Sequence, residues 1–165
     1  MKEPTKGRSN RPLTAFACKA LERFLTGEIQ HEVDVTRNNT RVKIVKTGSI
    51  NRFTVALFDE DILVVTLSDG KPLSICVSFT SFYDSHGQPS STTAERLNGL
   101  LDRLGVFGLI PKGVRLFRDQ EYHTTYIGKG DDKVAIGRNL IQSVNIKPVS
   151  NQLIFSGFTA RLQKR

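Results

Sequence analysis

Cysteine is scarce in this chain of 165 residues, and its two copies offer neither a disulfide framework nor a metal site. Cys18 and Cys76 lie far apart, and the sequence holds no C-x-x-C pair and no Cys/His cluster. Two isolated cysteines indicate free thiols in a reducing compartment, which predicts a cytoplasmic protein without a structural zinc site. We predict no cofactor.

Long apolar runs are missing as well. No run approaches the roughly 20 residues of a membrane-spanning helix, and residues 1–12 lack the apolar core of a secretory signal peptide. We therefore predict no membrane partner. The chain is nevertheless 38% hydrophobic, which is too apolar for a wholly disordered protein. Residues 1–12 mix Lys, Arg, Gly, Ser and Pro without an apolar anchor, which predicts a flexible basic arm. The length of the chain predicts a single domain over residues 13–165.

Catalytic motifs are also absent. Gly128-Lys129-Gly130 lacks the G-x-x-x-x-G-K-[ST] spacing of a phosphate-binding loop and is typical of a hairpin turn. Asp84 and His86 lie two residues apart in a loop, but the converging carboxylates of a two-metal nuclease do not accompany them. We therefore expect a turn stabilised by Asp84, no catalytic residues and no metal ligands, and we favour a protein that is not an enzyme.

Two helices are predicted from apolar residues that recur at helical spacing. The first helix covers residues 13–26. The second begins with a capping box at Thr92 and Glu95. It carries a leucine stripe formed by Leu97, Leu100, Leu101 and Leu104. Elsewhere apolar and polar residues alternate with a period of two between turn signals such as Asp69-Gly70. The pattern predicts an α+β fold with an antiparallel sheet of about seven to nine strands, an N-terminal helix and one internal helix.

Charge is unevenly placed along this basic chain, whose net charge is +8. Residues 1–52 hold 11 Lys and Arg against 5 Asp and Glu, residues 53–110 hold 3 against 7, and residues 111–165 hold 10 against 4. If the two basic ends meet in space, they form a positive surface that suits phosphates.

Basic and aromatic residues alternate in the two hairpins predicted after residue 112. A strand surface that carries tyrosine and arginine can stack bases and neutralise phosphates, as in sheets that bind single strands. The candidate set in this region is Arg115, Phe117, Arg118, Tyr122, Tyr126, Lys129, Lys133 and Arg138.

Thr92-Thr93-Ala94-Glu95-Arg96-Leu97-Asn98 resembles a T-T-x-x-R-[I/L]-N segment of small, mostly uncharacterised bacteriophage and plasmid proteins. The resemblance covers about residues 78–104. It implies an origin in a mobile element, and it singles out Arg96 and Asn98. We add Arg96 to the candidate nucleic-acid-binding residues, and we expect Arg96→Ala to weaken binding while it leaves the melting temperature nearly unchanged.

These observations predict a non-enzymatic, bacteriophage-type accessory protein that binds nucleic acid, in single-stranded form, in the host cytoplasm. Two alternatives stay open. The first is a phage-type protein that binds and inhibits a host protein through the N-terminal helix or the loop at residues 80–91. The second is a small metal-dependent nuclease that uses Asp84 and His86.

Overall fold

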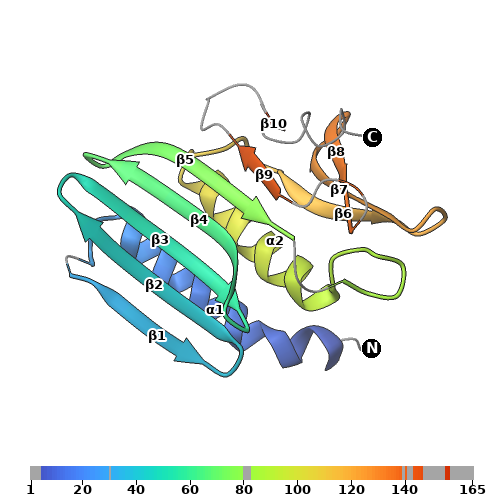
Figure 1. Cartoon of the computed structure of the whole chain (residues 1–165), viewed down its shortest axis with the longest axis horizontal. Helices are drawn as coiled ribbons and strands as arrows, with labels where there is room; N and C mark the ends of the chain where they lie inside the picture. Colours follow the sequence, from blue (N-terminus) through green and yellow to red (C-terminus); the bar gives the residue numbers. More distant parts are fainter. Residues whose placement is uncertain are drawn as a thin grey trace.

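Two helices cover one face of a large antiparallel sheet, and a small sheet lies beside them (Figure 1). The computed structural model describes residues 5–29, 31–79, 83–138, 140, 143–146 and 155–156, with the backbone alone at residues 5–10 and 155–156. All strand pairs are antiparallel in these residues, so the predicted α+β class with an N-terminal and an internal helix is confirmed.

The main sheet has seven strands in the order β1-β2-β3-β4-β5-β9-β10. Their bounds are Val33–Arg37 (β1), Thr40–Thr47 (β2), Ile50–Leu57 (β3), Glu60–Ser68 (β4), Lys71–Ser78 (β5), Ser143–Ile146 (β9) and Phe155–Ser156 (β10). The small sheet has three strands in the order β6-β7-β8, which are Arg115–Asp119, Thr124–Lys129 and Asp132–Ile136. The predicted strands are therefore divided between two sheets.

The helices begin earlier than predicted. Helix α1 is Thr5–Leu25, so the structure places residues 5–12 in a helix where we expected an arm; residues 1–4 lie outside the described residues. Helix α2 is Ser91–Val106, and its N-cap is Ser90 rather than Thr92. The Ser90 side chain accepts a hydrogen bond from the Thr93 N–H at 3.2 Å and so satisfies one of the free donors of the first turn.

Register aligns the apolar side chains of the main sheet in rows that run across the strands. One row is Val35, Val42, Val55, Leu63, Val77 and Val144, and the next is Val33, Ile44, Phe53, Val65, Ile75 and Ile146. From β2 to β9 both rows are buried. They face the helices, including the leucine stripe of α2. If one strand slipped by one residue, the apolar side chains that it contributes to both rows would point to solvent. Burial of these side chains therefore fixes the register.

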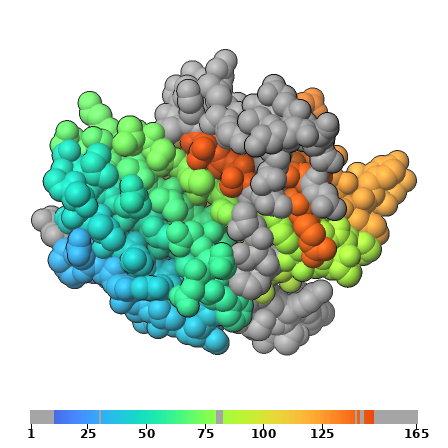
Figure 2. Space-filling view, viewed as in Figure 1, coloured from blue at the N-terminus to red at the C-terminus, as the bar shows by residue number. Residues whose placement is uncertain are grey.

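The opposite face of the main sheet is exposed to solvent in the described part of the chain. Figure 2 shows this face, with β2 to β5 in teal to green. Small and polar side chains such as Thr54, Ser74 and Cys76 line it, together with Lys43 and Arg52. The alternation of β5 allows this face either to be covered by a helix or to be open, and no helix among the described residues packs on it.

The two helices approach each other closely at Gly99 of α2. A Cβ atom at this position would lie 2.5 Å from the Thr14 Cγ2 atom and 3.2 Å from the Cys18 Sγ atom of α1. Glycine therefore lets the backbones come near enough for side chains on one helix to bond directly to the other.

Candidate nucleic-acid interface

The small sheet presents basic and aromatic side chains on one of its two faces. Register places Arg115, Gly128 and Lys133 in one row across the strands. The next row is Phe117, Tyr126 and Ala135. Because side chains of antiparallel partners lie on the same side of a sheet, these two rows form a single surface, which we call the outer face.

Phe117 and Tyr126 form a cross-strand aromatic pair at the centre of the outer face. Their ring centroids are 5.7 Å apart and the rings are tilted by 27°. The Lys133 Nζ atom lies 4.5 Å from the Tyr126 ring centroid and 5.8 Å from that of Phe117. The small residues Gly128 and Ala135 occupy neighbouring positions in the two rows, and both rings are partly exposed. Flat π surfaces beside a mobile ammonium group can stack a base and neutralise its phosphate.

The other face of the small sheet is anchored to helix α2. Leu116 and Ile127 are buried on this side. The Asn98 side chain accepts a hydrogen bond from the Leu116 N–H at 2.7 Å and donates one to the Leu116 carbonyl at 3.1 Å. Both polar groups of one β6 residue are thus satisfied by a single amide, which fixes the strand against α2. Asn98, a residue singled out by the resemblance, therefore has a structural role.

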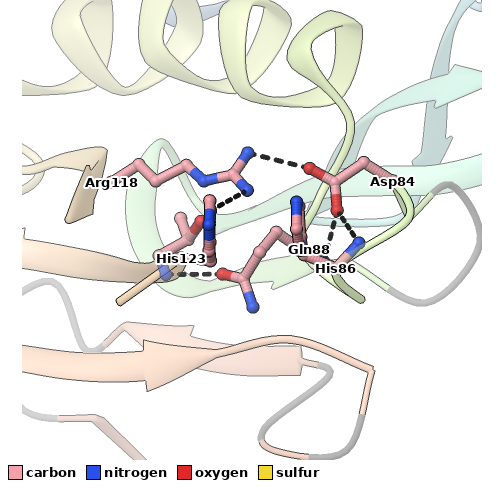
Figure 3. A network of polar contacts seen from close by, with 6 residues as sticks. Asp84, His86, Gln88, Arg118 and His123 are labelled. Carbon is pink, nitrogen blue, oxygen red and sulfur yellow. Dashed lines mark hydrogen bonds and ion pairs between the residues drawn. The ribbon is translucent and has the colours of Figure 1, made fainter. Parts of the chain in front are cut away.

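Arg118 lies on the opposite side of the small sheet from Phe117 and Tyr126. Its row partners are Thr125 and Ile136. Its guanidinium donates a hydrogen bond to the Asp84 carboxylate at 2.8 Å (Figure 3). The prediction grouped Arg118 with Arg115, but the structure separates the two across the thickness of the sheet.

Asp84 organises the turn at residues 83–90, as the sequence predicted. Its Oδ1 atom accepts hydrogen bonds from the N–H groups of His86 at 2.8 Å and Gln88 at 3.1 Å. Burial raises the pKa of the Asp84 carboxyl, but the two backbone donors and Arg118 outweigh it, so the pKa lies below its usual value. Since both carboxylate oxygens are occupied in this way, the geometry favours a structural role over metal binding.

The turn at residues 83–90 docks onto the connection between β6 and β7. The imidazole rings of His86 and His123 stack, with centroids 3.9 Å apart and planes inclined by 5°. The Gln88 side chain accepts a hydrogen bond from the Thr125 N–H, and Arg118 contacts His123 (Figure 3). Two loops that are distant in sequence thereby form one unit, and the pairing of His86 with His123 has no signal in the sequence.

The remaining candidates in the hairpins lie around the edges of the small sheet. Tyr122 is 70% exposed in the β6–β7 connection. Lys129 ends β7, and a Cβ atom at Gly113 would lie 3.4 Å from its Cε atom. The Arg138 guanidinium lies 5.4 Å from the Tyr83 ring centroid, beside the turn at residues 83–90. The structure therefore brings Arg115, Tyr126 and Lys133 together with Phe117, and places the other candidates elsewhere.

Arg96 is completely buried, so the expectation that it contacts a ligand from the helix surface is wrong for this structure. Its guanidinium donates hydrogen bonds to Thr14 of α1 at 2.7 Å, to Thr40 at 3.2 Å and to Asn39 at 3.4 Å. Burial lowers the pKa of this guanidinium. Arg96 therefore ties α2 to α1 and to the β1–β2 turn.

Cysteine alkylation tests the burial of the two thiols. Burial raises the pKa of Cys18 to about 11, and burial followed by the charge of Asp61 raises that of Cys76. At pH 8 the Cys18 thiolate fraction is then on the order of one in a thousand and rises about tenfold per pH unit. We expect iodoacetamide to modify the half-exposed Cys76 first, as followed by mass spectrometry, and both thiols equally in urea. Faster reaction at Cys18 in the folded protein would contradict its buried position.

Comparison of the chain with protein-family models, curated proteins and solved structures gives no match. In the part of the chain that the structure describes, no helix is long and apolar enough to cross a membrane. Nor do any three His, Cys, Asp or Glu side chains among those residues gather in a way that could hold a metal ion. A function must therefore be argued from the geometry of the surfaces themselves.

Proposed function

We propose that the protein binds single-stranded nucleic acid through the outer face of the small sheet. The observation that carries this proposal is the Phe117–Tyr126 pair with Lys133 beside both rings. Arg115 lies in the same row as Lys133 and adds a second cation to the face. Stacking on aromatic side chains requires bases with free π faces, which single strands offer and duplexes do not.

The wider role that we propose is that of a non-enzymatic accessory protein of bacteriophage type, acting in the host cytoplasm. The resemblance of residues 92–98 supports the mobile-element origin. The engagement of Asp84 by its own turn and by Arg118 favours binding over cleavage. Tyr122, Lys129 and Arg138 surround the small sheet, and a longer strand that leaves the outer face would pass near them.

Oligonucleotide binding tests this function. A fluorescein-labelled single-stranded oligonucleotide is titrated at two salt concentrations, and anisotropy gives the dissociation constant. Each phosphate that the protein neutralises contributes a slope of about −0.7 in log K against log salt. Tyr126→Ala is expected to weaken binding by about 1–3 kcal/mol, or roughly 5- to 150-fold, because it removes one stacking platform. Lys133→Ala is expected to reduce the salt slope.

Phe58→Ala is a matched aromatic control. Phe58 is 62% exposed at the β3–β4 turn of the main sheet, away from the outer face, and its removal is expected to leave affinity unchanged. Circular dichroism confirms that each variant keeps its fold. The proposal fails if the oligonucleotide does not bind even at low salt, or if Tyr126→Ala and Phe117→Ala both bind as tightly as the parent protein.

A further inference from the structure

A groove runs between helix α1 and β1, the terminal strand of the main sheet. Its volume is about 420 Å³, within the range of about 300–1,000 Å³ that is typical of ligand sites. The floor is apolar and is formed by Phe16, Ala20, Ile29, Val33, Val35 and Val42. The groove exists because the inner face of β1 extends beyond the cover of the helix, which leaves Val35 42% exposed.

The rim of this groove is positively charged. Lys19 and Arg23 of α1 line it on one side, and Arg37 at the end of β1 lines it on the other, with its guanidinium 4.7 Å from the Phe16 ring centroid. Arg23 is paired with Glu28 at 3.1 Å. Within the described part of the chain, neither Lys19 nor Arg37 has a carboxylate at ion-pair distance. The groove therefore suits an occupant that is both apolar and acidic.

The backbone of β1 offers hydrogen-bonding groups at the same place. Arg37 pairs with Thr40 across the two-residue turn, so these residues exchange both backbone hydrogen bonds. The alternation of antiparallel bonding then directs the N–H and C=O groups of residues 33, 35 and 37 toward β2. Those of Asp34 and Thr36 point away from the sheet. An edge of this kind is a template for an additional strand.

We propose that an extended, acidic segment of a partner protein docks in this groove and adds a strand to β1. Its backbone bonds to Asp34 and Thr36, its apolar side chains cover Phe16 and Val35, and its carboxylates lie near Lys19 and Arg37. Strand addition beside a helix combines affinity from the backbone with specificity from alternate side chains. The Asp34 carboxylate does not repel the acidic segment, because it lies on the other face of the sheet and forms an ion pair with Arg41 at 2.7 Å. The groove is separate from the outer face of the small sheet.

Peptide binding tests the proposal with the full chain. The probe is a fluorescein-labelled eight-residue peptide in which valine and glutamate alternate along the face turned toward α1, with threonine at the intervening positions, and its control replaces each glutamate with lysine. We expect the acidic peptide to bind in a salt-sensitive manner, and the lysine peptide to bind at least about tenfold more weakly, because like charges meet at the rim.

Two pairs of variants locate the contacts. Thr36→Pro removes an outward N–H of an edge strand without breaking the ladder to β2. This substitution is expected to lower the affinity for the acidic peptide about five- to tenfold, as for loss of one hydrogen bond. Thr36→Ala keeps the N–H group and is expected to leave the affinity unchanged. Arg37→Glu is expected to weaken binding about tenfold or more by placing like charges together, whereas Arg52→Glu, on the exposed face of the main sheet, has little effect.

Four outcomes overturn the proposal. The first is equal or tighter binding of the lysine peptide, and the second is undiminished binding of the acidic peptide by a folded Thr36→Pro variant. The third is a dimer of the parent protein in analytical ultracentrifugation that Thr36→Pro dissociates, because a second copy of the chain would then occupy this edge. The fourth is absence of acidic-peptide binding. Oligonucleotide binding is measured on the same samples, so that failure of the peptide proposal can be distinguished from failure of the nucleic-acid proposal.

Discussion

Replacement of Arg96 by alanine is expected to lower the free energy of unfolding by about 3–5 kcal/mol, through a large cavity and lost hydrogen bonds in the interior. The guanidinium is fully buried where α1, α2 and the β1–β2 turn meet. Alanine would leave the side chains of Thr14 and Thr40 without this donor. This reverses the sequence-based expectation of an unchanged melting temperature.

Arg103→Ala is the matched control for this prediction. Arg103 lies on the same helix and also links α2 to α1, through Glu22 at 2.6 Å, but its side chain is 40% exposed. Exposed ion pairs contribute about 0–1 kcal/mol, so little destabilisation is expected. Arg96→Met should fall between the two, because it fills much of the space and removes the cost of burying a charge. Urea unfolding followed by circular dichroism measures all three, and equal stability of Arg96→Ala and the parent protein would contradict the role of the network.

Leu101→Ala is expected to cost about 2–5 kcal/mol of unfolding free energy, as for other leucines in cores. Leu101 is 1% exposed and belongs to the stripe of α2 that meets the main sheet. The adjacent Asp102 is the control, because its side chain is 69% exposed. Asp102→Ala should change stability by no more than about 0.5 kcal/mol. Similar midpoints for the two variants in the same urea titration would show that the stripe does not form the core.

The elements of the fold were predictable because their patterns are local. Leucines at positions 97, 100, 101 and 104 can share a face only in a helix, and all four are buried as predicted. Alternation likewise predicted most of the strands from Val42 to Val77, and a continuous apolar run predicted the one at residues 62–67. The division into two sheets was not predictable, because it depends on which distant strand pairs with β5, and that partner is β9.

Arg96 was misplaced because the prediction relied on residue type. An arginine was assigned to the surface, although Arg96 lies four residues before Leu100 and therefore on the buried side of the helix. Its partners Thr14, Asn39 and Thr40 are 56 to 82 residues away in sequence. No pattern within α2 alone indicates such a network.

The candidate surface was predicted in part. Sequence grouped Arg115, Phe117, Tyr126 and Lys133, and the register places all four on the outer face. Arg118 could have been separated from them beforehand, since residues three apart on a strand point to opposite faces. Its pairing with Asp84 could not have been predicted, because that contact joins β6 to a turn 34 residues away in sequence.

The pairing of β5 with β9 has a consequence for the order of folding. Strands β1 to β5 follow one another as hairpins, so they can form in sequence from contacts between chain neighbours. The β9 strand can join them only after the chain has returned from α2 and the small sheet, which closes a loop from Ser78 to Ser143. Long loops carry a larger entropic cost of closure, so the meander of β1 to β5 is expected to form first and β9 to dock late. Until then β5 is itself an edge strand, and the second edge of the main sheet moves to β10 only when β9 and β10 have joined.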